Sequence, residues 1–455
     1  MNDESNWLEL EDQAEGIREK LGIPGLSIGV LSGGETRTAG FGVSSLEKGN
    51  PVWGETLFQI GSITKTFTAA LVMQLIEAGE LSLDASVRSV LPEFKVADEA
   101  AAAGVTLRHL LTHSGGWDGD LFVETGEGTD ALSAYIARLS DRDQLFEPGA
   151  LFSYNNSGFA VLGRILEKVG GAAVETLYRE RIFEPLGMKH AFLNAAEVIT
   201  EDFSVGHHNG EDGMQVARPW RMPRATLPVG GIVTNAGDLL RYAACLMNDG
   251  KAASGDRILG PGSITRMWTP QLEIHPGDRS SVCLSWMRRE LESGFTVSHS
   301  GGTNGQVTYL VLLPERKFAV AVMTNANAGR KAIQKIAALA VEAYLGVKIE
   351  SPSPIDATPE ELAAYAGTAV RPGFELHLRM LGNHLVGLVT STIGFPTEDD
   401  PPFPPEPPFR IGLCGPDRMI ALEGVYEGQP IDVLRDEMGE IRFLRMSSRL
   451  FRWTP

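Results

Sequence analysis

The order of apolar and polar positions divides the chain into two strand-rich ends and a long helical middle. Apolar residues recur at helical spacing over residues 9–21 and 330–345, which predicts an amphipathic helix at each place. Short apolar runs bounded by turn residues predict strands at residues 25–31, 35–42, 295–299, 307–313 and 318–323. Helical patterns dominate from the first hairpin to about residue 230. We therefore predict an α/β fold in which an antiparallel sheet flanked by helices carries an inserted helical lobe.

The composition changes at Ser351-Pro352-Ser353-Pro354, which is typical of a linker. Apolar and polar residues alternate over residues 374–380, and short strand patterns follow at residues 385–389, 419–422, 430–434 and 441–446. We therefore predict a first domain over residues 1–350 and a small antiparallel, barrel-like β domain over residues 351–455. Residues 396–408 are rich in proline and have two interpretations. A stiff loop is favoured over a polyproline segment that binds a partner.

The most apolar helix of the chain begins directly after a serine and a lysine three residues apart. Residues 66–76 are apolar on nearly every face, which predicts a buried helix, and Gly79 is a suitable C-terminal residue for it. Ser62 and Lys65 stand at its start, on one face. A lysine shielded from water can act as the base that activates a serine hydroxyl. A serine that only caps the helix is the structural alternative, and the two interpretations weigh evenly at this point.

The spacing by itself is not specific, because Ser45 and Lys48 repeat it. This second copy runs into Gly49-Asn50-Pro51, a sequence typical of a solvated turn. The surroundings therefore favour the pair at Ser62 and Lys65.

Tyr154 and Asn156 form a second candidate group. Tyr154 is the one tyrosine in the chain with Asn two positions later, and a helix is predicted from residue 157. A tyrosine beside a lysine can hold or shuttle a proton, and an asparagine amide can donate to a substrate amide. A purely structural role would be the usual interpretation of such a pair in isolation.

The third candidate group follows a predicted strand at His299-Ser300-Gly301-Gly302. We expect a glycine turn here with free backbone N–H groups, so that the N–H groups of Gly302 and Ser62 form an oxyanion hole. His299 would then orient the carboxylate or carbonyl end of a substrate. A structural histidine at the end of a strand is the alternative.

Two other histidine motifs receive structural interpretations. His113-Ser114-Gly115-Gly116 repeats the third group but follows a helix, so its glycines are predicted to end that helix. His109 and His113 have a metal-ligand spacing, yet no third ligand is apparent, and we predict no metal and no cofactor. His207 and His208 are predicted to lie in an exposed loop.

Composition narrows the class of protein. The 455 residues carry a formal net charge of −18, which argues against nucleic acid and anionic membrane surfaces as partners. Three scattered cysteines indicate neither a disulfide framework nor a zinc site. No signal peptide or membrane-spanning run is recognisable, so we expect a cytoplasmic protein.

The three groups together carry a resemblance. Ser62-x-x-Lys65, Tyr154-x-Asn156 and His299-x-Gly301, in this order, resemble the signature of the serine β-lactamase and penicillin-binding-protein superfamily. The resemblance covers roughly residues 10 to 345, and residues 362–367 are similar to the lipocalin-like domain attached to some peptidases of this group. Class C β-lactamases usually have lysine where His299 stands, so the similarity is greater to esterases and D-aminopeptidases.

The resemblance implies a β-lactamase-like fold and a serine hydrolase that works through an acyl-enzyme. Ser62 would be the nucleophile, Lys65 and Tyr154 would move protons, and Asn156, His299, Gly301 and Gly302 would bind substrate. A small peptide amide, with or without D-residues, or an ester is the expected substrate, and a homo-oligomer is compatible with the resemblance. A slowly acylated binding or sensor protein, or a true β-lactamase, is the alternative.

Overall fold

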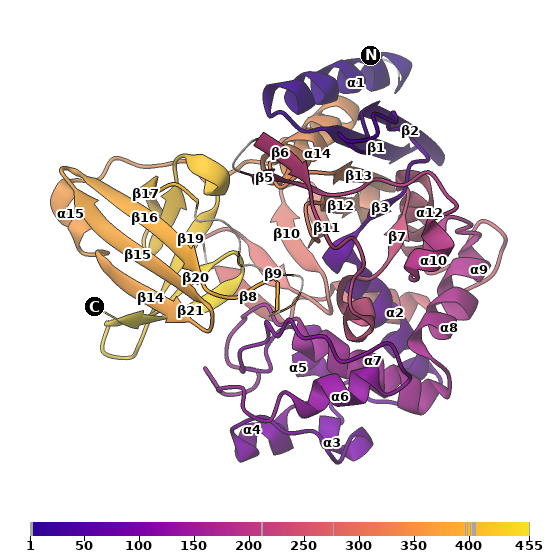
Figure 1. The fold of residues 1–455 in the computed structure, drawn as a ribbon, viewed down its shortest axis with the longest axis horizontal. Helices are drawn as coiled ribbons and strands as arrows, with labels where there is room; N and C mark the ends of the chain where they lie inside the picture. The colour runs from indigo at the N-terminus through magenta and orange to yellow at the C-terminus, as the bar shows by residue number, and fades with distance from the viewer. Residues whose placement is uncertain are drawn as a thin grey trace.

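The computed structural model describes residues 3–454, except 211, 212, 276, 396, 398, 401 and 403–405. Figure 1 shows two bodies side by side, an α/β body and a barrel that contains the C-terminus. In the proline-rich stretch predicted at residues 396–408, residues 396, 398, 401 and 403–405 lie outside the described residues.

The α/β body is built on an eight-stranded antiparallel sheet with the order β2-β1-β13-β12-β11-β10-β9-β8. Five neighbouring strands, from the edge strand β2 to β11, are the ones that the apolar runs predicted. They are β1 (Gly25–Ser32), β2 (Glu35–Gly42), β11 (Gly294–Gly302), β12 (Val307–Leu313) and β13 (Phe318–Thr324). The sequence pattern missed the last three strands at the other end of the sheet, β10 (Met287–Leu291), β9 (Ser280–Val282) and the edge strand β8 (Leu272–His275). These strands are short, and β10 contains Arg288, Arg289 and Glu290, so they lack the apolar signal of a covered strand.

Helices cover both faces of this sheet, which explains its near-continuous apolar strands. Successive residues of β13 point to opposite faces: Val320 and Val322 pack with α1 (Asp3–Lys20) and α14 (Gly329–Leu345). Ala319, Ala321 and Met323 pack into the second core, with α2 (Thr64–Glu77) and α12 (Ala236–Met247).

The helical lobe is inserted between β2 and the C-terminal half of the sheet, as predicted. It contains α3 (Val87–Val90), α4 (Glu99–Gly104), α5 (Leu107–Leu111), α6 (Ala131–Ala137) and α7 (Ser157–Gly170), which lie together at the bottom of Figure 1. Helix α2 lies between this lobe and the sheet (Figure 1). Its residues Thr64 to Met73 are all buried, so the segment that follows Ser62 has little freedom to move.

The C-terminal body is a closed barrel of eight antiparallel strands, which confirms the predicted antiparallel β domain. Its strands are β14 (Gly367–Arg371), β15 (Phe374–Leu381), β16 (His384–Ser391), β17 (Phe409–Gly415), β18 (Arg418–Ala421), β19 (Pro430–Arg435), β20 (Ile441–Met446) and β21 (Arg449–Thr454). The first strand pairs with the last one, Thr368 opposite Thr454, so neither is left as an open edge.

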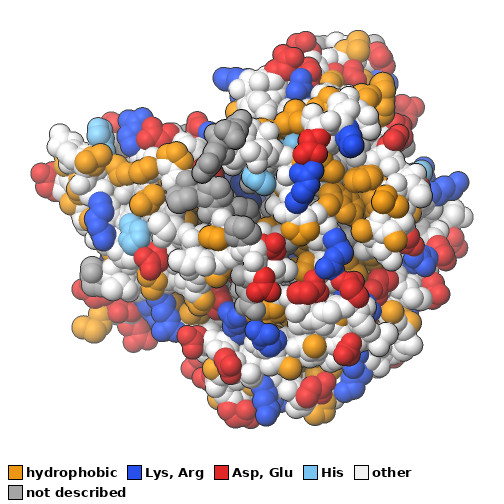
Figure 2. Space-filling model, in the orientation of Figure 1, with side chains coloured by type: hydrophobic (Ala, Val, Ile, Leu, Met, Phe, Trp, Pro, Cys, Tyr) orange, Lys and Arg blue, Asp and Glu red, His pale blue; other side chains and the backbone are white. Residues whose placement is uncertain are grey.

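The surface is mixed in charge. On the face drawn in Figure 2, acidic and basic side chains alternate over both bodies. Within the described part of the chain, no helix has the length and apolarity needed to cross a membrane.

Candidate active site

Ser62 and Lys65 face each other at the start of α2. A 3-10 turn, η1 (Gly61–Ile63), leads into the helix, and Ser62 is the partly exposed residue of that turn. Lys65 Nζ lies 2.9 Å from Ser62 Oγ and donates to the Val229 carbonyl oxygen at 2.8 Å. The side chain of Ser62 makes no cap contact with the helix, so the capping alternative is wrong.

Lys65 is placed to act as a base. The residue is fully buried. Burial lowers the pKa of Lys65 well below its ordinary value, and the charge of Arg449 lowers it further against the opposing effect of Asp120. A lowered pKa favours the uncharged amine, which can accept the Ser62 proton.

Tyr154 lies beside this pair, in the loop before α7. Lys65 Nζ is 5.1 Å from the centre of the Tyr154 ring. The Tyr154 hydroxyl is buried and, among the described residues, has no hydrogen-bond partner. Burial raises the pKa of Tyr154, and the neighbouring Ser62 hydroxyl opposes this only in part. The phenol therefore keeps its proton and is available as a donor.

His113 also belongs to this group, although the sequence indicated only a structural role for it. Its ring stacks on Tyr154 with 4.1 Å between centroids, and Phe159 lies on it at 5.0 Å. The backbone N–H of Asn155 donates to His113 Nδ1 at 3.0 Å. Burial, followed by the charges of Lys65 and His299, lowers the pKa of His113 well below its ordinary value, so the ring is neutral. The signal that could have found it was its repetition of the His-Ser-Gly-Gly motif.

His299 lies in β11, on the other side of the site. Its Nδ1 lies 2.6 Å from the Ser300 carbonyl oxygen, which can only accept, so Nδ1 carries the proton. Burial, together with the charge of Lys65, lowers the pKa of His299 to about 3. The ring is therefore neutral. Its Nε2 carries no proton and can only accept a hydrogen bond. The predicted role in orienting a carboxylate or carbonyl oxygen needs a donor and does not suit this atom.

The glycines after His299 bring the strand against the turn that holds Ser62. A Cβ atom on Gly301 would lie 1.9 Å from the Ile60 carbonyl oxygen, so only glycine allows this approach. Gly302 packs on Gly61, which has a φ of +51°. Both glycines remain in β11, paired with Thr308 and Val307, so the predicted glycine turn is wrong. The chain turns only at residues 303–306, because β12 continues the pairing to Val307.

Comparison with known proteins agrees with this arrangement. The beta-lactamase family model matches residues 10–344. The chain belongs to the beta-lactamase family. It is a serine hydrolase with the β-lactamase-like fold, as predicted. Penicillin-binding protein 4 of Amycolatopsis lactamdurans is 31% identical over 82% of this chain and 98% of its own length.

Two solved structures show which parts of this family member have counterparts. The crystal structure of SurE covers 100% of both chains at 25% identity with a TM-score of 0.72, so its likeness includes the barrel. The D-alanine carboxypeptidase AmpC of Burkholderia cenocepacia covers 75% of this chain and 100% of its own, at 25% identity and a TM-score of 0.64.

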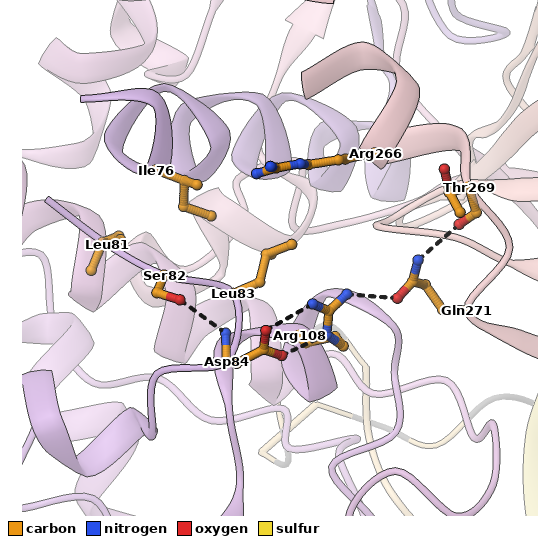
Figure 3. Close-up of a pocket in the computed structure, with 9 residues that line it drawn as sticks. All are labelled: Ile76, Leu81, Ser82, Leu83, Asp84, Arg108, Arg266, Thr269 and Gln271. Carbon is orange, nitrogen blue, oxygen red and sulfur yellow. Dashed lines mark hydrogen bonds and ion pairs between the residues drawn. The ribbon is translucent and has the colours of Figure 1, made fainter. Parts of the chain in front are cut away.

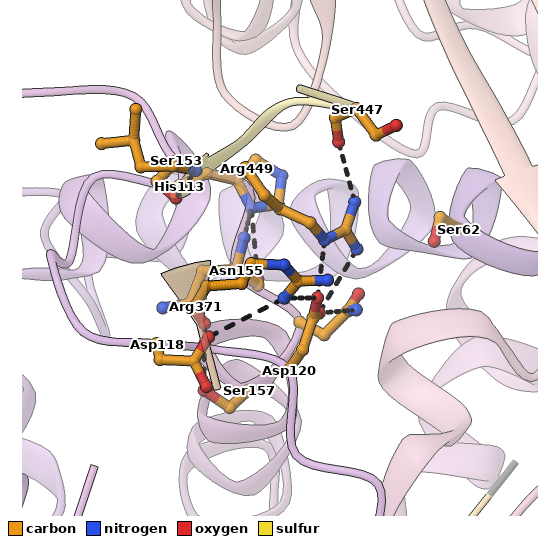
Figure 4. A network of polar contacts seen from close by, with 12 residues as sticks. Ser62, His113, Asp118, Asp120, Ser153, Asn155, Ser157, Arg371, Ser447 and Arg449 are labelled. Carbon is orange, nitrogen blue, oxygen red and sulfur yellow. Dashed lines mark hydrogen bonds and ion pairs between the residues drawn. The ribbon is translucent and has the colours of Figure 1, made fainter. Parts of the chain in front are cut away.

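The beta-lactamase fold of this chain carries a charged network that the sequence did not reveal (Figure 4). Asp120 accepts from Asn156 Nδ2 at 2.6 Å, from Arg449 Nε at 2.6 Å and from Arg371 Nη1 at 2.9 Å. Both arginines come from the barrel, more than 250 positions along the chain from Asp120. No local pattern in the sequence could indicate such pairs.

Two further histidine interpretations can now be judged. His109 Nδ1 accepts from the Thr106 N–H at 3.2 Å in a capping box at the start of α5. Among the described residues, no group of three His, Cys, Asp or Glu side chains is arranged to hold a metal. The exposed loop predicted at His207 is wrong: it begins β5 (His207–Gly210), is buried, and accepts from the Leu46 N–H at 3.1 Å.

One hollow in the surface lies away from the reacting groups. A cavity of about 440 Å³ is bounded by the end of α2, Arg108, Arg266 and Gln271 (Figure 3). Arg108 is held there by Asp84 and Gln271 at 2.8 Å each. None of its lining residues belongs to the group around Ser62.

Proposed function

We propose that this protein hydrolyses small peptide amides or esters through an acyl-enzyme on Ser62. The observation that carries the proposal is the contact of a fully buried lysine with the Ser62 hydroxyl, 2.9 Å from Nζ to Oγ. The first step moves the Ser62 proton to Lys65 while Oγ forms a bond to the substrate carbonyl carbon.

The remaining steps use the neighbours of this pair. The backbone N–H groups of Ser62 and Gly302 are the proposed oxyanion hole, an arrangement that typically contributes ~3 kcal/mol per donor. Tyr154 gives its proton to the leaving nitrogen or oxygen and recovers one from Lys65. In deacylation, the neutral Lys65 amine accepts a proton from the attacking water, relayed through the Tyr154 hydroxyl, and Lys65 then returns this proton to Ser62 Oγ as the serine leaves the carbonyl carbon.

The charge around the site favours a substrate with a free carboxylate. Arg330, at the start of α14, extends its Nη2 to 3.8 Å from where a Cβ on Gly302 would stand. The side chain is solvent-exposed, and no described residue forms an ion pair with it. A guanidinium in this position suits the carboxylate of a short peptide. The D-alanine carboxypeptidase among the similar structures supports peptides that end in a D-residue.

Burst kinetics with a p-nitrophenyl ester test the proposal. Sustained release after the burst, lost in Ser62→Ala and in Lys65→Ala, is the expected result. One equivalent released without turnover would instead identify the slowly acylated sensor. Turnover that survives Ser62→Ala would refute the mechanism.

The substrate class is determined by measuring the hydrolysis of a panel of candidate substrates. D-alanyl-D-alanine peptides, amino-acid amides of both configurations and a chromogenic cephalosporin are compared by kcat/KM. Preference for the peptides supports peptide hydrolysis, whereas a dominant cephalosporin rate would establish a true β-lactamase. The cytoplasmic location and the homo-oligomer stay predictions.

A further inference from the structure

The cavity of about 440 Å³ lies at the C-terminal end of α2, whereas the reacting pair stands at the start of that helix. Small-molecule sites typically have volumes of ~300–1,000 Å³. Figure 3 shows the lining side chains arranged around one space, with Arg266 on one side and Arg108 on the other. Ile76, Leu81 and Leu83 are the apolar residues of this lining. The cavity therefore combines an apolar surface with two guanidinium groups.

Arg108 is held in the wall of the cavity by two neighbours. Its Nε and Nη2 donate to the two oxygens of Asp84 at 2.8 and 3.0 Å, and its Nη1 donates to Gln271 Oε1 at 2.8 Å. The hydrogen bond from Arg108 lowers the pKa of Asp84, so this carboxylate stays charged and balances the guanidinium. Of the five N–H groups of an arginine, two are left for a ligand here.

Arg266 brings a positive charge that its neighbours do not balance. It stands in the last turn of α13 (Pro261–Trp268), and Figure 3 shows its side chain extending over the end of α2 towards Ile76. The side chain is solvent-exposed, and among the described residues none forms an ion pair or a side-chain hydrogen bond with it. Because Asp84 and Arg108 compensate each other, the lining carries one excess positive charge.

The chemistry of the lining selects the class of ligand. The Ser82 hydroxyl accepts the Asp84 N–H at 3.4 Å, and its own proton has no acceptor among the described residues. This proton and the free guanidinium N–H groups suit an oxyanion. One excess positive charge matches a carboxylate better than a phosphate, which carries about two negative charges. The apolar side of the cavity favours a ligand that also has a short nonpolar part.

We propose that this cavity binds a small organic acid, with its carboxylate on Arg266 and Arg108 and its nonpolar part against the end of α2. The cavity and the reacting pair lie at opposite ends of a helix of 14 residues, which is roughly 20 Å long. A ligand here therefore leaves Ser62 accessible. The inference goes beyond the proposed function and does not depend on it.

Phenylacetate and phenylacetamide test the proposal, because they share a ring and differ in charge. Their dissociation constants are measured by NMR titration of the full-length protein. The wild type is expected to bind phenylacetate about tenfold more tightly, the effect of one charge-assisted hydrogen bond. Arg266→Gln should bring the ratio of the two constants towards one, and Arg266→Lys should keep most of it. Acetate, which lacks the ring, should bind at least about tenfold more weakly than phenylacetate.

Arg316→Gln is the matched control. Arg316 is also solvent-exposed and without an ion pair to any described residue, but it lies in η4 (Pro314–Arg316), between β12 and β13. This variant should leave the ratio unchanged. No saturable binding of phenylacetate below about 10 mM, or an unchanged ratio in Arg266→Gln, would overturn the proposal. Acetate that binds as tightly as phenylacetate would also contradict it, because the nonpolar part would then contribute nothing.

A last pair of variants separates this cavity from the reacting site, where Arg330 is the other exposed arginine proposed to meet a carboxylate. The preference for phenylacetate should persist in Arg330→Gln and in Ser62→Ala, since neither residue lines the cavity. A preference that Arg330→Gln abolishes and Arg266→Gln leaves intact would place the acid beside Ser62 and overturn the inference. The titration needs no turnover, so its outcome is independent of whether the protein hydrolyses esters.

Discussion

Gly61 and Gly302 lie with their backbones in direct contact, so that a Cβ atom on Gly61 would stand 2.6 Å from the Gly302 nitrogen. Gly61 precedes the nucleophile and also has a φ of +51°. This contact sets the distance between the Ser62 and Gly302 N–H groups, which are the proposed oxyanion donors.

Gly61→Ala is therefore expected to lower kcat/KM by roughly 100-fold, the effect of misplacing one oxyanion donor. Gly79→Ala is the matched control, because Gly79 also has a positive φ, +77°, but nothing within 4 Å of its missing Cβ. It should cost roughly 1 kcal/mol of stability and leave activity unchanged. Equal activity of the two variants, measured with a p-nitrophenyl ester, would contradict this role of the contact.

The activity should depend on a neutral Lys65. Burial lowers the pKa of this lysine well below its ordinary value, so the uncharged amine is present at lower pH than for an exposed lysine. The rate constant kcat/KM should therefore fall as the pH drops through this lowered pKa and reach a plateau above it. A pH profile between about pH 4 and pH 10 checks this. An acidic limb centred on the ordinary lysine pKa would contradict the lowered pKa of Lys65.

His113 is expected to hold the Tyr154 ring through stacking. His113→Ala removes the ring and should lower kcat by about tenfold or more, since Tyr154 then loses its fixed position. His113→Phe keeps a ring of similar shape and should retain most of the activity. His384→Ala, on the exposed surface of the barrel, is the control. Equal loss in the Phe and Ala variants would show that a ring nitrogen matters instead.

Asp118 should make the fold more stable in mild acid. Burial, with the charge of Asp120, raises the pKa of Asp118 to about 6, above its ordinary 3.8. A raised pKa favours the folded state below the unfolded pKa, and this advantage is lost as the pH rises through the folded value. Asp118→Asn should therefore gain on the order of 2 kcal/mol relative to wild type between about pH 4 and pH 7. Urea unfolding of both proteins at these two pH values measures the gain. A stability difference between Asp118→Asn and wild type that does not change with pH would contradict the expectation.

The elements that the sequence predicted well are those with a strong local signal. The strands β1, β12 and β13 are covered on both faces, so their apolar runs are nearly continuous. Helix α2 was predicted in the same way, because it is buried over most of its length and its sequence is correspondingly apolar. The reacting pair at its start was favoured over Ser45 and Lys48 because an apolar helix follows it, whereas the second copy runs into a turn-like sequence.

What the sequence by itself determined is the set of reactive side chains on separate elements: Ser62 with Lys65, Tyr154 with Asn156, and His299 with its glycines. Only the tertiary structure decided which of their atoms donate or accept hydrogen bonds and which residues they contact. It showed that His299 accepts, that Asn156 donates to Asp120, and that His113 belongs to the group. It also brought Arg371 and Arg449 of the barrel to Asp120. The physical reason is that donor direction and ion pairing depend on neighbours in space, which are 36 positions apart for Asp120 and Asn156 and 329 for Asp120 and Arg449, whereas hydrophobic periodicity is a property of neighbours in the chain.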